Sequence, residues 1–237
     1  MIKKTPCIRI RLTDTKPDIF ESKVGGYGYI PHNGDFPHDQ DGNQLRFLAQ
    51  IDCSEIDFEP FPKSGLLQFW IFNDDLYGCD FGNPEQNKFR ILYYPEIDQT
   101  VTEEEIASKF IKSAYDEENL FPVDQECGMT FTSGESCQRP DFDADEEDWN
   151  AYDLLFTGDS DQEPQITGSL HQIGGYPYFT QDDPREEDSE YDFLLFQLDS
   201  DSDKILWGDM GIGNFFINSQ KLKALDFSDV LYNWDCG

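Results

Sequence analysis

The sequence contains three blocks of residues twice, in the same order, and this repetition limits its fold more than any other feature. Residues 23–29 (KVGGYGY) recur as 172–178 (QIGGYPY), 47–52 (FLAQID) as 194–199 (LLFQLD), and 65–71 (GLLQFWI) as 211–217 (GIGNFFI). The copies are offset by 149, 147 and 146 residues. Because coincidence does not preserve both order and spacing, the pattern predicts two tandem structural repeats.

Each copy consists of a glycine pair, a short apolar run that ends in aspartate, and a second apolar run that opens on glycine. Short runs rich in Ile, Leu and Phe between Gly, Asp and Pro are typical of buried strands. The pairs Gly25–Gly26 and Gly174–Gly175 favour turns with a positive φ. Asp52 and Asp199 lie at equivalent strand ends, where we expect them to bind local backbone.

Further strands are expected at residues 7–13, 89–94 and 126–132, where apolar residues alternate with polar ones or form short runs. Thr102 to Glu105 (TEEE) is a capping box that predicts a helix over about 102–116. A shorter helix is expected after Ser219, ending near Asp226. Strands in runs with few helices indicate an α+β fold with mainly antiparallel sheet, packed as one compact body.

We expect one domain over residues 1–237, made of repeats at about 20–118 and 166–237 with an acidic segment at about 119–165 between them. Acidic residues are dense over 139–165, which favours a solvated loop or an edge hairpin. The apolar residues from Trp149 to Phe156 indicate a strand anchored within it.

The chain is strongly acidic, with 49 Asp and Glu against 17 Lys and Arg and a net charge of −32. Such a surface repels nucleic-acid phosphates and anionic membranes, so neither is an expected partner. A basic protein partner is the expected one, since the summed field attracts positive charge. The alternative is an acidic surface that serves solubility alone.

Six cysteines are spread along the chain without a CxxC motif, and no apolar run approaches 18 residues. The N-terminal residues alternate Ile with Arg, so no signal peptide is expected. These features indicate reduced thiols and a cytoplasmic protein. The sequence leaves the oligomeric state open.

Five motifs in order give the chain a family resemblance: 22–27 (SKVGGY), 47–52 (FLAQID), 65–70 (GLLQFW), 207–209 (WGD) and 232–236 (YNWDC). From about residue 20 to the C-terminus, the chain resembles the YwqG-like family of bacterial proteins of unknown function. The resemblance implies an α+β fold with two related halves and no established activity. It also implies a loose association with toxin–immunity neighbourhoods. It supplies no catalytic residue.

His32 and His38 lie among Asp35, Asp39 and Asp41, a set that could bind a divalent metal ion but is equally typical of a turn. Segments 141–145 and 199–203 begin like EF-hand loops. Both lack the glycine at position six and the glutamate at position twelve. We therefore predict no metal site and no cofactor.

Nucleophilic catalysis would need an activated Ser or Cys. Cys53 and His171 are the candidates, but the second repeat has Ser200 at the place of Cys53, and no GxSxG motif occurs. The symmetry of Asp52 and Asp199 leaves open a ligand groove shared by the repeats. The candidate ligand-binding residues are Asp52, Asp199, His32, His38 and His171; catalytic residues stay unassigned.

Two functions follow as hypotheses. The first is a non-catalytic binding protein that engages a basic protein partner through its acidic surface, with an immunity-type role against a cationic toxin as its sharpest version. The second is an enzyme or small-ligand-binding protein with its site in the cleft between the repeats.

Overall fold

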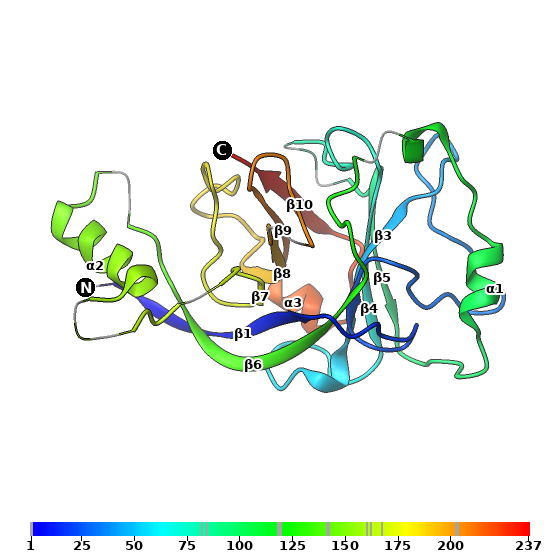
Figure 1. Cartoon of the computed structure of the whole chain (residues 1–237), viewed down its shortest axis with the longest axis horizontal. Coiled ribbons are helices and arrows are strands. Elements are labelled where there is room, and N and C mark those ends of the chain that lie inside the picture. Colours follow the sequence, from blue (N-terminus) through cyan, green and yellow to red (C-terminus); the bar gives the residue numbers. More distant parts are fainter. Residues whose placement is uncertain are drawn as a thin grey trace.

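The computed structural model describes residues 2–81, 83, 85–117, 120–140, 143–159, 161, 163–166, 168–201 and 204–237. Its ten strands form one antiparallel sheet in the order β10-β9-β8-β7-β1-β6-β2-β3-β4-β5 (Figure 1). The strands are β1 (Lys4–Thr13), β2 (Lys23–Val24), β3 (Arg46–Asp52), β4 (Leu66–Ile71), β5 (Phe89–Tyr94), β6 (Cys127–Cys137), β7 (Gln172–Ile173), β8 (Phe193–Asp199), β9 (Ile212–Ile217) and β10 (Val230–Asp235). The helices are α1 (Glu103–Ser108), α2 (Glu146–Thr157) and α3 (Ser219–Lys223), with 3-10 turns at Cys53–Glu55 and Ala114–Glu117.

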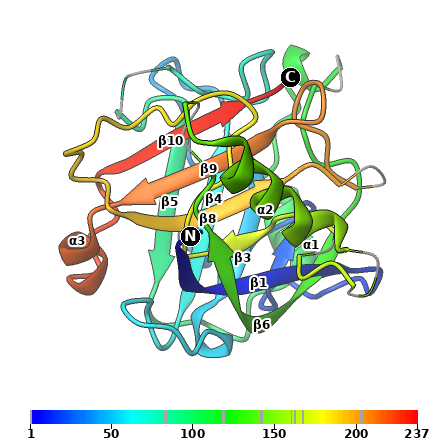
Figure 2. The ribbon, with the colours of Figure 1, turned by 90° about the vertical axis from the view of Figure 1, so that its left-hand side faces the viewer.

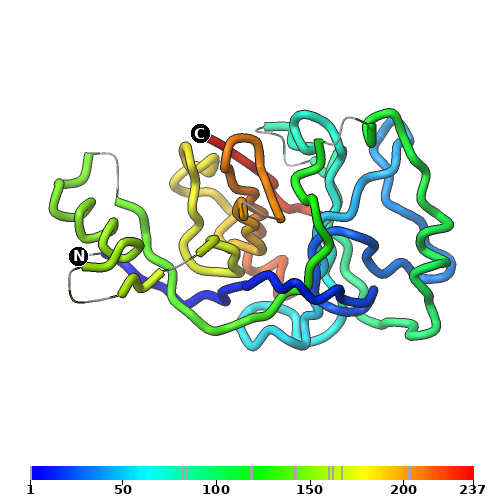
Figure 3. The backbone as a smooth tube through the Cα atoms, in the orientation of Figure 1, coloured from blue at the N-terminus to red at the C-terminus, as the bar shows by residue number. Residues whose placement is uncertain are grey.

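The two longest strands, β1 and β6, form a central ribbon of ten residue pairs, from Lys4↔Cys137 to Thr13↔Gly128. Figure 3 shows the two strands running side by side along the molecule. β1 also pairs with β7, and β6 with β2. The sheet therefore extends from this ribbon in two directions, as a β2–β5 wing (β2, β3, β4, β5) and a β7–β10 wing (β7, β8, β9, β10).

The wings have matching irregularities. The β3–β4 register shifts between Phe47 and Ala49, and the β8–β9 register shifts between Leu194 and Phe196. Such a bulge bends its strand and increases the local twist. Each wing therefore bends at the corresponding place in its first long strand.

Buried amide side chains also make corresponding hydrogen bonds in the two wings. Gln50 Oε1 accepts from the N–H of Tyr29, and Gln197 Oε1 accepts from the N–H of Tyr178. On the next strands, the side-chain amides of Gln68 and Asn214 donate to the carbonyls of those same tyrosines. Each wing thus uses two buried amides to hold the segment that follows its glycine pair.

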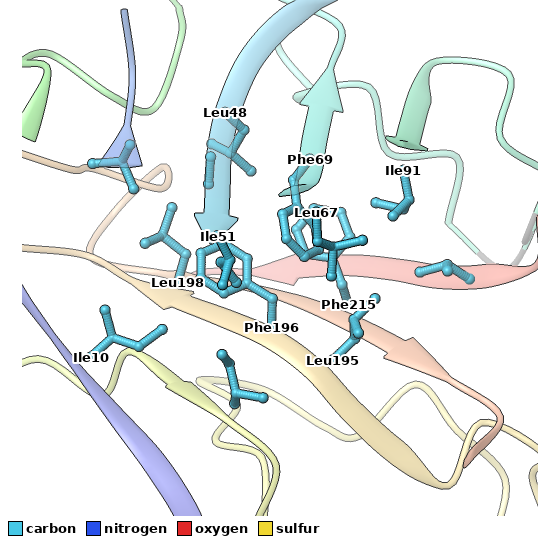
Figure 4. Close-up of a cluster of buried hydrophobic side chains, with 14 of the residues drawn as sticks. Ile10, Leu48, Ile51, Leu67, Phe69, Ile91, Leu195, Phe196, Leu198 and Phe215 are labelled. Carbon is cyan, nitrogen blue, oxygen red and sulfur yellow. The ribbon is translucent and has the colours of Figure 1, made fainter. Parts of the chain in front are cut away.

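The wings pack face to face, with their strands crossing one another (Figure 2). The ring of Phe69 lies 4.6 Å from that of Phe196 and 5.0 Å from that of Phe215, measured between centroids. Figure 4 shows side chains of β1, β3, β4, β5, β8 and β9 gathered in this space. At the outer edges, the rings of Phe89 and Tyr232 lie 5.3 Å apart. The centre of the junction is therefore a solid aromatic core.

Most expected strands are confirmed, including residues 89–94, and all four paired glycines have φ between +67° and +78°. The α+β class with mainly antiparallel sheet is also confirmed. The short helix after Ser219 is present as α3. In the described part of the chain, no helix is long and apolar enough to cross a membrane.

The helix expected over 102–116 is much shorter, because α1 ends at Ser108. Thr102 caps it as predicted, accepting from the N–H of Glu105. Beyond the helix, the side-chain amide of Gln44 donates to the carbonyl of Lys109 and accepts from the N–H of Ile111. These hydrogen bonds satisfy the backbone groups of Lys109 and Ile111 in a non-helical conformation. The spacing of the apolar residues, which predicted a longer helix, gives no sign of them.

The prediction of a loop, hairpin or strand within 139–165 is wrong, since Glu146–Thr157 is the 12-residue helix α2. Its first turn carries Glu146, Glu147 and Asp148, whose negative charge favours a helix N-terminus. Tyr152 and Leu155 are its buried residues, three apart, as one helical face requires. Because acidic residues are so dense here, the helical spacing of the apolar residues was not recognised from the sequence.

Candidate functional site

Helix α2 is held at one end of the molecule by a small apolar cluster. Tyr152 and Leu155 pack with Cys137 at the end of β6. The backbone N–H groups of Gln165 and Ile166 both donate to the carbonyl of Leu155, over 2.9 Å each. These contacts hold the helix beside the β7–β10 wing, with a hollow of about 810 Å³ between them.

The walls of this hollow, called the α2 hollow below, are formed mainly by carboxylates, aromatic rings and hydroxyl groups. Asp153, Asp199 and Asp201 supply carboxylates. Tyr152, Phe156 and Tyr178 supply aromatic rings, and Thr157, Ser169, Thr180 and Ser200 supply hydroxyl groups. Gly168, Leu170 and Met210 complete the lining. No Lys, Arg or His is among the described residues that line it. Its wall is therefore acidic and aromatic.

Asp199 is held in place by the backbone around it. It ends β8, and its Oδ2 accepts from the backbone N–H of Leu170 over 2.7 Å. Burial raises the pKa of Asp199, although hydrogen bonds from the N–H groups of Leu170 and Ser200 oppose that rise. The carboxylate is thus held in place but poorly solvated.

Ser200 fixes the backbone beside Asp199. Its hydroxyl donates to the carbonyl of Gly211 over 2.7 Å and accepts from the N–H of Trp207 over 3.0 Å. The N–H of Ser200 also donates to the carbonyl of Gly211. The strand-end side of the hollow is therefore rigid.

Two polar groups in the wall are largely withdrawn from water. Burial raises the pKa of Tyr152 to about 12, with a smaller contribution from Tyr178, so its phenol is neutral at pH 7. The Oγ1 atom of Thr180 is buried and has no hydrogen-bond partner among the described residues. Its hydrogen-bonding capacity is therefore unused within the described part of the chain.

His171 lies next to this site without lining it. Its Nδ1 accepts from the backbone N–H of Asp199 over 2.9 Å. The residue is 2% exposed, and burial lowers the pKa of its ring to about 4. A buried neutral imidazole of this kind supports the Asp199 backbone and is poorly placed to exchange protons with solvent.

The structure brings together two of the sequence-predicted residues, Asp199 and His171. Asp52 lies in the other wing, where its carboxylate caps the following 3-10 turn by accepting from Ser54. His32 is exposed and contacts Glu105 through Nδ1 over 2.7 Å. His38 takes part in a backbone bridge to Gln44. None of Asp52, His32 and His38 lines the α2 hollow.

Neither nucleophilic nor metal chemistry is visible at the predicted positions. Burial raises the pKa of the Cys53 thiol to about 12, which disfavours the reactive thiolate. Within the described ranges, no group of three His, Cys, Asp or Glu side chains is placed to hold a metal ion. Residues 141, 142, 202 and 203 of the two EF-hand-like segments lie outside those ranges.

Sequence reasoning missed the contribution of α2 to this site: Tyr152, Asp153, Phe156 and Thr157. The available signal was the three-residue spacing of Trp149, Tyr152 and Leu155, which fits a helix. Thr180 carried no signal, because only the packing of the chain buries its hydroxyl.

A second hollow, of about 550 Å³, lies where the two wings meet at the surface. Phe58 and Glu59, which follow the β3 end, form one side, and Gly175 and Asp192 of the other wing form the opposite side. None of the five predicted ligand-binding residues lines it.

Comparison with known proteins gives one family match. A family model described as a domain of unknown function, DUF1963, matches residues 22–236. No curated protein matches the chain.

Proposed function

Because the chain belongs to the DUF1963 family, whose description names no activity, we propose a function from its own charges and geometry. It is a non-catalytic binding protein that engages a basic protein partner through its acidic surface. The α2 hollow carries this proposal, since carboxylates and aromatic rings form its wall and no described lining residue is basic. Such a wall complements positive charge.

The arrangement of the basic residues supports the proposal. Many of them already pair with carboxylates of the same chain: Lys16, Lys23, Arg46, Lys63, Lys88, Lys109, Lys112, Arg185, Lys204 and Lys221. With 49 acidic residues against 17 basic ones, these pairs leave a large excess of carboxylates. That excess attracts a cationic partner over a distance.

The candidate catalytic groups also favour binding over catalysis. Cys53 has a raised pKa, and His171 is a buried neutral ring. A nucleophile and its base would need to lie within hydrogen-bond reach of each other. Cys53 instead contacts the carbonyl of Ile51, and His171 contacts the amide of Asp199.

An immunity-type role against a cationic toxin is the sharpest version of this function. Neutralising a toxin requires fast association, and complementary charges raise association rates. The resemblance to YwqG-like proteins supports this version. A cytoplasmic location fits it, and the six free cysteines support that location.

Capture of a partner at two salt concentrations tests the function. The immobilised protein is exposed to cell extract at about 20 mM and about 500 mM salt, where screening lengths differ several-fold. An unrelated acidic protein of matched charge is the control. We expect a basic protein that binds this chain and not the control at low salt, and that high salt releases. Retention of no such protein at low salt contradicts the proposal.

A small-ligand site between the wings is the second candidate. The hollow between Phe58 and Asp192 supports it, because both wings contribute to its wall. A metabolite library screened by thermal shift tests it, with Phe58→Ala as the variant. A ligand of this site should stabilise the native chain and not the variant; equal stabilisation of both counts against it.

We also infer that the wings descend from one duplicated unit, the tandem repeats expected from the sequence. The matching register shifts and amide hydrogen bonds support this origin. Superposing the backbones of residues 23–72 and 172–218 tests it. Unrelated backbone paths would contradict a duplication.

A further inference from the structure

We propose that the α2 hollow binds an alkyl-guanidinium or alkyl-ammonium group, presented by an arginine or lysine side chain of the basic partner. This inference rests on the proposed function and names the site where the partner's specificity is determined. It gives the attraction between the acidic chain and its basic partner a specific site, whereas net charge alone would spread this attraction over the whole surface.

The carboxylates come from two separate elements. Asp153 lies on α2 and is exposed, whereas Asp199 ends β8 and is partly buried. A long cationic side chain entering between the helix and the strand end would pass the first carboxylate and reach the second. Because Asp199 is anchored by Leu170, little ordering is needed when its partner arrives.

The wall suits an organic cation better than a metal ion. In the described part of the chain, the carboxylates of the hollow do not converge into a group that could hold a metal. Its volume of about 810 Å³ also far exceeds that of a bare ion. The rings of Tyr152, Phe156 and Tyr178 belong to the wall, and aromatic rings attract cations and pack against alkyl stems.

The chain already binds its own arginines with the same set of groups. The guanidinium of Arg46 lies 4.5 Å from the centre of the Phe110 ring and pairs with Asp116. The guanidinium of Arg185 lies 4.2 Å from the Phe216 ring centre and pairs with Asp183. The α2 hollow has the carboxylate and the ring, and no described lining residue supplies the cation.

Thr180 is a further polar residue in the wall of the α2 hollow. Its Oγ1 is buried within a residue that lines the hollow, and it has no partner in the part of the chain that the structure describes. The N–H of Thr180 donates to Asp235, so the position of the residue is fixed.

The binding test uses Nα-acetyl-arginine-methylamide and its uncharged analogue Nα-acetyl-citrulline-methylamide, titrated into the full chain at pH 7.5 and followed by NMR. We expect saturable shifts with the arginine probe, centred on residues 152–157, 168–170 and 199–201, and at least tenfold weaker binding of citrulline. Spermidine in a parallel titration distinguishes a free polyamine from a partner's side chain, and tighter binding of spermidine contradicts a side-chain ligand.

Matched variants separate this site from the general surface charge. Asp153→Asn with Asp199→Asn removes two charges from the hollow. Glu146→Gln with Glu147→Gln removes two from α2 at positions outside its lining. We expect the first pair to weaken arginine binding at least tenfold and the second to change it less than twofold. Asp153→Asn alone, at an exposed position, gives a check that does not depend on Asp199 for folding.

Three results would overturn this inference: no saturable binding of the arginine probe, equal binding of citrulline, or equal effects of the two double variants. The proposed function is judged separately, by capturing the basic partner with the Asp153→Asn and Asp199→Asn variant. Unchanged, salt-sensitive capture would refute the hollow as the site while retaining the function. Loss of capture with this variant and not with the Glu146 and Glu147 variant supports both.

Discussion

The backbone N–H of Asp199 donates to Nδ1 of His171 over 2.9 Å, and this link has a counterpart in the other wing, where Asp52 donates to the hydroxyl of Ser22 over 2.8 Å. The two wings make the same connection with different acceptors. Only the imidazole can take up a proton, and a proton on Nδ1 would remove the acceptor. The β7–β10 wing is therefore sensitive to acid at a place where the β2–β5 wing is not.

Acid should destabilise the protein through His171. Its pKa falls from 6.5 to about 4 because burial disfavours the charged ring. Between these values the unfolded chain binds a proton that the folded chain does not, so the free energy of unfolding decreases as the pH falls. The full effect is about 3 kcal/mol, complete below pH 4 and absent above pH 6.5. Asp199, whose pKa burial raises, contributes with the opposite sign.

Urea denaturation of His171→Ser and of the native chain at pH 7 and pH 4 measures this contribution. The variant introduces the residue found at the equivalent position 22, and it should lose about 3 kcal/mol less stability over that range. His38→Ser, which changes a histidine outside this link, should behave like the native chain. If His171→Ser and the native chain lost the same stability between pH 7 and pH 4, the imidazole would not control the pH dependence of stability.

Phe69 should be among the residues on which stability depends most. It is fully buried between the wings, against Phe196 and Phe215. Phe69→Ala should lower the free energy of unfolding by about 3–5 kcal/mol, measured by urea denaturation. Phe81→Ala is the control, because Phe81 is 54% exposed, and it should cost under about 1 kcal/mol. Similar costs would contradict a junction packed around Phe69.

The contribution of Arg46 to stability should come from the shape of its guanidinium group as well as from its charge. Nε donates to Asp116 over 2.6 Å, Nη2 binds the same carboxylate, and the group stacks on Phe110. Burial alone would raise the pKa of Asp116, but its bonds with Arg46 and Ser113 lower it to about 2. Arg46→Met should destabilise the fold by about 2–3 kcal/mol, and Arg46→Lys should recover less than half of that.

The control for Arg46 is Lys63→Met, which removes an exposed cation that lies near Asp57 and Glu59. Exposed ion pairs contribute about 0–1 kcal/mol, so this variant should remain near the native stability. If Arg46→Lys had the same free energy of unfolding as the native chain in urea denaturation, the forked geometry of the guanidinium would not contribute to stability.

Gly175 should tolerate no side chain. Its φ is +78°, and a Cβ would lie 2.2 Å from Ser136 Oγ and 2.9 Å from Cys7 Cβ, on the central ribbon. Gly42 has a φ of +84°, but no atom of the described residues lies within 4 Å of a Cβ there. Gly42→Ala should therefore cost only the backbone strain, about 1–2 kcal/mol, and Gly175→Ala clearly more. Equal melting temperatures for the two variants would refute this steric explanation.

Short sequence patterns predicted those elements whose ends are determined by the neighbouring residues. The strand at Phe89–Tyr94 was predicted at both ends, because an apolar run lies between polar segments. β6 was predicted to end at Thr132, yet it continues to Cys137. Residues 133–137 have no strand pattern of their own and are extended because they pair with β1. Long-range pairing of this kind is not encoded in a short window of sequence.

The candidate site was predicted only in part, for a similar reason. Asp199 was recognised from its place at the end of a repeated strand. Asp153 and Thr180 were not, since the α2 hollow exists only when Tyr152 and Leu155 dock the helix on Cys137. That docking depends on tertiary contacts, and the surrounding acids gave the helix the composition of a solvated loop.

The pairing of β1 with β6 has a consequence for how the chain folds during synthesis. β1 leaves the ribosome more than 100 residues before its partner β6, and β7 follows later still. Until then both long edges of β1 have no strand to pair with. Contacts between such distant segments slow folding, so we expect this protein to fold slowly for its size, with assembly of the ribbon as a late step.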